Sequence, residues 1–348
     1  MTKRILTGIL LSAAAAGAAE LSGLIFYDYT HDATRGVPSG EVTNRSFNVG
    51  RAYLTVTSAP SENLACKLQF DVGQLKSYKF EGDIRARLID SDGDTLRYSL
   101  TNSDAGFYAY VKNASVEWTN DLGKWTFGVQ GMNLFNVQEA TFGNRFLAKP
   151  LMDERGFSSS ADLGAGYSNR FADLVTASVL YTNGGGYKKT ESNKYKKLSL
   201  QVVAGEPALN KKDGWNAGLV YSLEPTSADY STTVLGLLGG WAGSGARVGV
   251  EYDSRTTGGA TDVTSTILGF YGDYKLPFAP GWSVVGSFDA YDPDTDSSAK
   301  NNETSLIVGA KWQPVKGLVL CPNLKTVGFE DSSLDALTYY RVSFEVKI

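Results

Sequence analysis

The chain has 348 residues with 33 basic and 37 acidic side chains, a formal net charge of −4, two cysteines and one histidine. This acidic balance, with no cluster of lysine and arginine, excludes the basic surface of a nucleic-acid-binding protein. The 38 glycines, 19 tyrosines and 16 phenylalanines favour an all-β chain.

The N-terminus has the pattern of an export signal. Lys3 and Arg4 precede an apolar run over residues 5–16, and small residues follow at 16–18. This pattern is typical of a secretory signal peptide, which we place at residues 1–19, leaving one domain over residues 20–348. Without Lys3 and Arg4 the net charge becomes about −6. The apolar run is too short to span a bilayer and no later segment approaches roughly 20 apolar residues, which excludes a helical membrane protein.

Sixteen later segments alternate apolar and polar residues, which is the period of a β-strand. Short and long connections between them also alternate, as in an up-and-down membrane barrel whose two rims differ. Cys66 and Cys321 fall on distant segments, so we expect no disulfide between them. The predicted strands are 20–31, 45–58, 63–74, 107–118, 124–131, 159–168, 173–182, 195–204, 214–224, 232–242, 246–255, 264–276, 282–292, 303–313, 318–329 and 337–348.

Twelve charged residues in these segments have the parity opposite to that of the apolar face: Arg51, Lys67, Asp71, Asp162, Arg247, Glu251, Asp253, Lys311, Lys325, Arg341, Glu345 and Lys347. They therefore point away from lipid and predict water inside the barrel. A closed barrel plugged by salt bridges is the alternative, but sixteen strands enclose a lumen too wide for side chains alone to fill. The predicted pore wall comprises Arg51, Asp71, Asp162, Arg247, Glu251 and Arg341.

The tryptophans indicate a membrane interface. All six lie beside a short connection and share the parity of the apolar face of their strand. Tryptophan prefers the level of the lipid headgroups, so we predict a membrane-interface girdle at one rim. A soluble sandwich gives no reason for this clustering. The girdle consists of Trp118, Trp125, Trp215, Trp241, Trp282 and Trp312.

One long connection, residues 132–158, carries charges of both signs and does not alternate. Structureless loops of this length are uncommon and usually functional. We interpret it as a loop folded into the bore, where it narrows the channel. Its charges form the predicted pore constriction: Glu139, Arg145, Lys149, Asp153, Glu154 and Arg155.

Enzyme and metal chemistry have little support. His31 has no second histidine to form a metal pair, and no serine arrangement surrounds it, so we predict no catalytic residues. The acidic runs at 90–94 and 292–296 resemble calcium loops, but the first departs from the spacing of such loops in its glycine and at Thr101. Solvated loop tips are the better interpretation, and no cofactor is implied.

The chain resembles bacterial outer-membrane porins, most closely the group related to phosphate-selective porins. The similarity lies in RAYL (51–54), TFGNRF (141–146), DERG (153–156), SADLG (160–164) and PN (322–323). It implies a sixteen-stranded barrel, a homotrimer and a third outer loop, here 132–158, folded inward as the constriction. It also implies that Arg51 lines the bore and that Arg145, Lys149 and Arg155 form the basic side of the eyelet. Without a dense lysine cluster or an arginine ladder, phosphate selectivity is not implied.

We therefore predict an all-β protein, a sixteen-stranded antiparallel transmembrane β-barrel with an inward-folded constriction loop, in the bacterial outer membrane. Its predicted function is passive diffusion of small hydrophilic solutes and ions, and its partners are the lipid bilayer, these solutes and its own copies in a homotrimer. The alternatives are a substrate- or anion-specific channel of the same fold, an outer-membrane enzyme, or a secreted β-sandwich adhesin.

Overall fold

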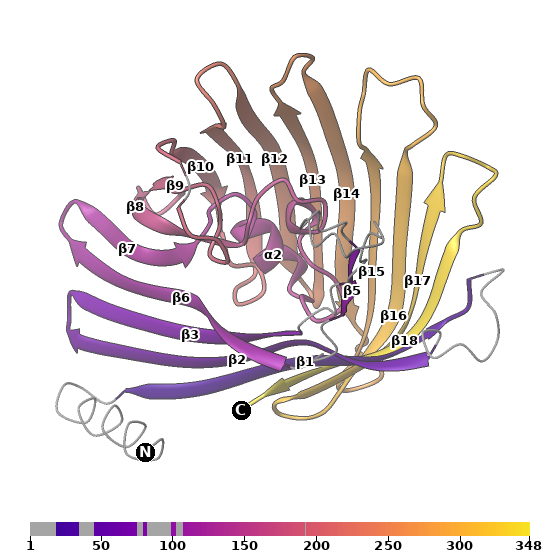
Figure 1. Ribbon diagram of the computed structural model, residues 1–348. Helices are drawn as coiled ribbons and strands as arrows, with labels where there is room; N and C mark the ends of the chain where they lie inside the picture. Colours follow the sequence, from indigo (N-terminus) through magenta and orange to yellow (C-terminus); the bar gives the residue numbers. More distant parts are fainter. Residues whose placement is uncertain (1–18, 35–44, 75–78, 82–98, 102–106, 192) are drawn as a thin grey trace, which may run out of the picture.

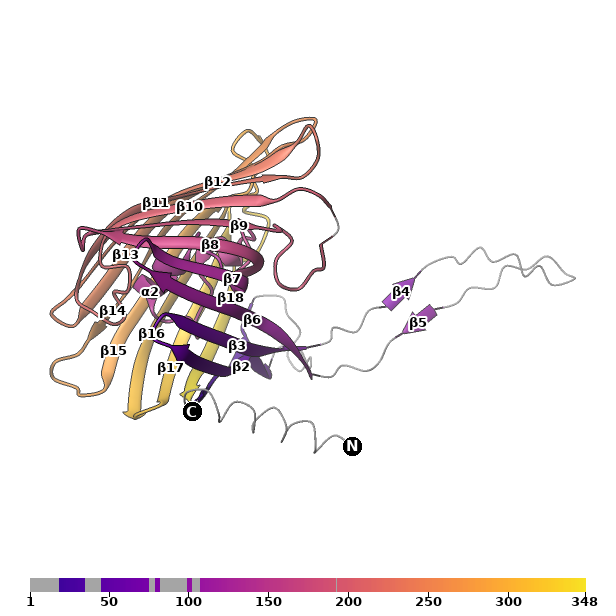
Figure 2. The same ribbon diagram turned by 90° about the vertical axis from the view of Figure 1, so that its left-hand side faces the viewer.

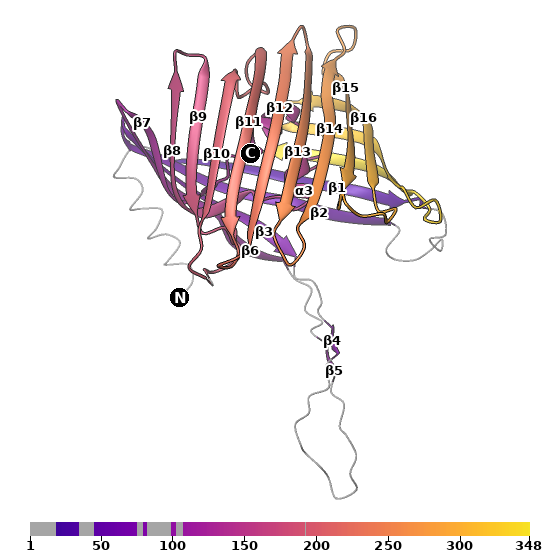
Figure 3. The ribbon, with the colours of Figure 1, turned by 90° about the horizontal axis from the view of Figure 1, so that it is seen from above.

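The computed structural model describes residues 19–34, 45–74, 79–81, 99–101, 107–191 and 193–348. The predicted signal peptide and the acidic run at 90–94 lie outside these ranges, apart from residue 19. Sixteen antiparallel strands form one closed barrel, in which β1 pairs with both β2 and β18 (Figure 1). Figure 3 shows β8 to β16 side by side in one wall.

All sixteen predicted strands are confirmed, with ends that differ by three residues at most. The barrel strands are β1 (Glu20–Asp32), β2 (Arg45–Ser61), β3 (Leu64–Gln74), β6 (Phe107–Asn120), β7 (Gly123–Gly131), β8 (Ala161–Phe171), β9 (Val175–Thr182), β10 (Lys197–Gly205), β11 (Gly214–Pro225), β12 (Ser231–Gly243), β13 (Ala246–Thr257), β14 (Val263–Lys275), β15 (Trp282–Asp292), β16 (Glu303–Val315), β17 (Leu318–Phe329) and β18 (Leu337–Lys347).

Two connections contain structure that the alternation did not predict. Between β3 and β6, the short strands β4 (Lys79–Glu81) and β5 (Ser99–Thr101) form a separate two-stranded sheet (Figure 2). Between β7 and β8, the predicted structureless loop contains α2 (Asn136–Phe142) and α3 (Leu151–Glu154). Such short helices are stable only where a surface packs against them, so a periodicity search misses them.

The two faces of the wall differ as the alternation predicts. On β13, Val248, Val250 and Tyr252 face outward and are 40–50% exposed, whereas Glu251 and Asp253 face inward and are buried. Exposed apolar side chains also lie on most of the other barrel strands. An apolar outer surface over a polar interior is the arrangement of a membrane barrel.

The six tryptophans form three directly opposed cross-strand pairs near short connections. Trp118 pairs with Trp125, Trp215 with Trp241, and Trp282 with Trp312. In the last pair the ring centroids are 5.5 Å apart and the rings are stacked. Directly opposed aromatic residues contribute to the stability of a strand pair.

Short turns close the rim near these pairs. Ser244 and Gly245 alone join β12 to β13, with φ values of 50° and 82°. A two-residue hairpin turn with positive φ at both positions matches the twist of the strands. At the same rim Gly23 and Ile348 exchange two backbone hydrogen bonds of 2.9 Å, which help to close the barrel. Cys66 and Cys321 are free thiols on β3 and β17. Within the described ranges, no helix has the length and apolar character needed to cross a bilayer.

Candidate functional site

The connection over residues 132–160 lies inside the barrel and packs against one side of the wall (Figure 1). From the loop, Leu134 and Met152 are fully buried and Val137 is 3% exposed. They belong to one apolar cluster with inward-facing wall residues such as Val220 on β11 and Ile267 on β14. Burial of apolar surface on this side positions the loop and leaves its charged side toward the opposite wall.

Glycines on the inner wall make room for the loop helices. A Cβ added at Gly249 or Gly240 would lie 2.8 or 2.6 Å from Thr141 of α2. At Gly269 it would lie 2.2 Å from Leu151 of α3. Since real Cβ atoms essentially never approach this closely, a side chain at any of these three positions would force the neighbouring side chains to shift.

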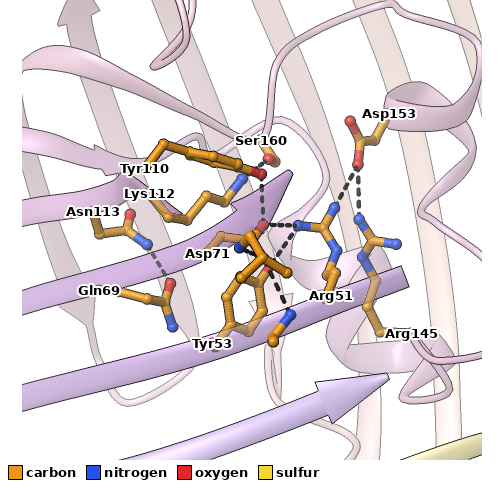
Figure 4. Close-up of polar contacts among 12 residues, drawn as sticks. Arg51, Tyr53, Gln69, Asp71, Tyr110, Lys112, Asn113, Arg145, Asp153 and Ser160 are labelled. Atoms are coloured by element: carbon orange, nitrogen blue, oxygen red, sulfur yellow. Dashed lines mark hydrogen bonds and ion pairs between the residues drawn. The ribbon is translucent and has the colours of Figure 1, made fainter. Parts of the chain in front are cut away.

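A charged network joins the loop to the wall at β2 and β3 (Figure 4). Arg145 binds Asp153 within the loop at 2.9 Å, and Asp153 also lies 4.0 Å from Arg51 on β2. Arg51 in turn binds Asp71 on β3 at 3.1 Å, and Tyr110 on β6 donates to the same carboxylate at 2.8 Å. Charge-assisted bonds of this kind fix side-chain geometry.

Arg155 anchors the far end of the loop to the opposite part of the wall. It binds Asp289 on β15 at 3.0 Å and forms a second ion pair with Glu303 on β16. Its guanidinium lies 4.5 Å from the ring centroid of Tyr291. Nearby, the carboxylate of Glu154 lies between two lysines: its Oε2 is 3.5 Å from Lys149 Nζ, and its Oε1 is 3.9 Å from Lys325 Nζ.

The loop arginine Arg145 is largely enclosed. Burial lowers its pKa and Arg51 lowers it further, whereas Glu139 and Asp153 oppose the shift. The guanidinium stays protonated, because arginine is not deprotonated in proteins. Burial also raises the pKa of Tyr187, so its hydroxyl stays neutral.

Among the cavities beside the loop in the described part of the chain, three exceed 200 Å³. The first, of about 230 Å³, separates the loop from the opposite wall and is lined by Arg145, Lys149 and Glu154 on one side and Arg341 on the other. The second, of about 390 Å³, shares Arg51 and Lys149 with it. The third, of about 540 Å³, shares Phe146 with the first and is lined by residues near the short-turn rim.

The structure brings most of the predicted constriction and wall residues together. Arg51, Arg145, Lys149, Glu154 and Arg341 line the first cavity; Asp71 and Asp153 line the second, and Arg247 the third. Glu139 pairs with Arg145 at 3.2 Å. Arg155 does not line the three cavities, since its guanidinium is committed to two carboxylates.

Three predicted wall residues face inward but are buried: Asp71, which lines the second cavity, and Asp162 and Glu251, which line none of the three. Glu251 is 1% exposed behind α2 and α3, and Asp162 is 2% exposed. Asp162 accepts hydrogen bonds from the backbone N–H groups of Leu163 and Gly184, so it holds a connection in place. Alternation along the strand predicted that these side chains point inward, but it did not predict that other segments of the chain bury them.

Other residues of the site were not selected from the sequence. Tyr110 and Lys112 on β6 lie against Tyr187 and Lys188 from the β9–β10 connection. Alternation counted from Trp118 would turn Tyr110 and Lys112 outward, and nothing local indicated the bulge at Lys112 or that the connection folds onto these side chains.

The remaining sequence candidates stay at the rims. His31, at the end of β1, stacks on Tyr340 with ring centroids 6.4 Å apart. In the run at 292–296, Asp292 and Asp294 accept hydrogen bonds from backbone N–H groups two residues on. In the described part of the chain, no group of three His, Cys, Asp or Glu residues is arranged to hold a metal ion.

No model of a protein family and no curated protein matches the chain. Several solved structures, however, have a similar fold. Salmonella typhi OmpF, in complex with daunomycin, is 11% identical over 96% of this chain and 99% of its own, with a TM-score of 0.64. An anion-selective porin from Comamonas acidovorans is 12% identical over 95% and 99%, with a TM-score of 0.64. Trimeric OmpT, an outer membrane protein of Vibrio cholerae, is 13% identical over 96% and 100%, with a TM-score of 0.59. The chain therefore has the sixteen-stranded barrel fold of the bacterial outer-membrane porins.

Proposed function

We propose that the protein is a porin of the bacterial outer membrane that lets small hydrophilic solutes and ions diffuse through its bore. The observation that carries this proposal is the series of three charged cavities that share lining residues along the loop. The cavities are lined by polar side chains, whereas the outer surface of the barrel is apolar. This combination supports a water-filled path through the barrel rather than a ligand pocket. The similarity of fold to porins supports the same function.

In this proposal the loop over 132–158 is the constriction. Arg145, Lys149 and Glu154 face the wall residues Arg51 and Arg341 across a cavity of about 230 Å³. Charges of both signs across a narrow bore produce a transverse field, which orders water and penalises apolar solutes. Salt screens such charges less than charges at the rim, because low-dielectric walls surround them.

The protein acts as a channel rather than an enzyme. The six tryptophans form the girdle at one membrane interface, and residues 1–19 direct export. The protein assembles as a homotrimer, in line with the trimeric form of one structure of similar fold.

Conductance in planar bilayers tests the function, and one substitution tests the constriction. Ser287 on β15 lines the first cavity and carries no charge. Ser287→Trp should roughly halve single-channel conductance, because conduction depends on the narrowest radius. Ser298→Trp, at an exposed position of an outer connection, is the matched control and should have no effect. Absence of channels in the wild type would refute the porin function, and equal conductance of both variants would show that the first cavity is not the constriction.

A further inference from the structure

Two aromatic side chains, one from the loop and one from the wall, meet inside the barrel. Phe146 lies in the connection between α2 and α3, and Phe26 lies on β1 and lines the first cavity. Their ring centroids are 6.4 Å apart, with an angle of 52° between the ring planes. Phe26 is 5% exposed. The loop therefore touches β1 through an apolar contact, in addition to its charged contact with Arg51 on β2.

Phe146 lies between two polar cavities. It is the one residue that the linings of the first and third cavities have in common. Charged side chains line both cavities, such as Arg145 and Arg341 in the first and Arg247 and Lys311 in the third. A solute that moves from one cavity to the other therefore passes the ring of Phe146.

The wall at the level of these rings is apolar as well. On β15, Val285 is 4% exposed and lies between Ser283, which lines the third cavity, and Ser287, which lines the first. Val285 belongs to one apolar cluster with Cys321 on β17, and Phe146 packs against this cluster. A strand advances about 13 Å over four residues, so the two polar linings are separated along β15 by the length of several water molecules.

The polar side chains at the same level are bonded to one another. Asn323 Nδ2 donates to Ser343 Oγ at 3.0 Å and to Cys321 O at 2.9 Å, and Asn323 Oδ1 accepts from Arg341 Nε at 2.9 Å. Asn323 and Ser343 are both buried. These groups therefore offer little solvation to an ion that passes the two rings.

We propose that Phe26 and Phe146 form a hydrophobic gate between the first and third cavities. A narrow apolar passage expels water, and an ion that enters a dry passage loses its hydration without compensation. The gate conducts when the ring of Phe146 turns away from Phe26. Because Phe146 lies between the two helices, its ring can turn while Leu134 and Met152 keep the loop packed on the wall.

This gate rests on the proposed channel function and adds a second barrier to it. The charges of the constriction discriminate between solutes, whereas the two rings determine whether the passage between the cavities is wet.

A matched pair of substitutions separates wetting from size, since asparagine and leucine have similar volumes but only asparagine is polar. Phe26→Asn and Phe146→Asn should each raise single-channel conductance in potassium chloride at least about threefold over Phe26→Leu and Phe146→Leu, because a polar side chain keeps the passage wet. The current through Phe26→Asn should carry no additional noise, because β2 and β18 fix β1 and the loop stays packed. Phe278→Asn, at an 82% exposed position between β14 and β15, is the control and should conduct as the wild type does.

The outcomes distinguish the gate from the channel. A conducting wild type with equal conductance of the asparagine and leucine variants would overturn the gate but not the channel, since size alone or another path would then set the current. Absence of channels in the wild type and in every variant would overturn the channel and the gate together. A silent wild type with conducting asparagine variants would support the gate and refute passive diffusion through the native bore.

Discussion

The apolar contact between the loop and the wall provides a quantitative test of what holds the loop inside the barrel. Met152 of α3 is fully buried in the cluster with Leu134 and Ile267. A Cβ at Gly236 on β12 would lie 2.6 Å from its Cε, so the thioether occupies space that the wall leaves open. Met152→Ala would create a void there that the rigid strands cannot fill.

Truncation of a buried methionine to alanine costs about 2–5 kcal/mol. With a cost of about 3 kcal/mol, the population of the detached loop should rise by about 150-fold. The barrel should stay closed, because its backbone hydrogen bonds do not involve the loop. We therefore expect frequent transitions to a more conductive state and greater open-channel noise in Met152→Ala.

Single-channel recording measures this noise, and Leu237→Ala is the control. Leu237 lies on β12, one residue from Gly236, but faces outward and is 52% exposed. The substitution Leu237→Ala should therefore leave the single-channel current trace unchanged. Wild-type noise in Met152→Ala would contradict the conclusion that apolar packing holds the loop.

Three further predictions concern the ion pairs, the girdle and assembly. Arg155→Ala leaves Asp289 and Glu303 without their cation, so it should destabilise the loop by about 2 kcal/mol and shift reversal potentials under a salt gradient toward cation selectivity, unlike Lys212→Ala at an exposed turn. Tryptophan fluorescence in bilayers should be quenched more by nitroxide lipids labelled near the headgroup than by those labelled at mid-chain, and equal quenching would refute the girdle. Unheated protein in sodium dodecyl sulfate should migrate as a trimer and heated protein as a monomer; a monomer in both lanes would contradict the assembly.

The sequence by itself predicted the barrel. Strand period, connection lengths and tryptophan parity are local properties of the chain, and an antiparallel barrel pairs mostly consecutive strands. In β13 the alternation of Arg247, Val248, Gly249 and Val250 already assigns each side chain to a face. Of the residues chosen for the site from pattern and resemblance, Arg51, Arg145, Lys149, Glu154 and Arg341 line one cavity.

Only the tertiary structure decided which of these charges pair and which are covered. Glu251 shares its parity with bore-lining residues, yet α2 and α3 bury it, because the packing of a loop on a wall is a contact between distant residues. Lys112 depends on a bulge that arises from the pairing of β6 with β3 across a long connection. Period-two alternation describes a single strand, whereas a bulge is a property of two strands in register, so the inward direction of Lys112 exists only once the barrel has formed.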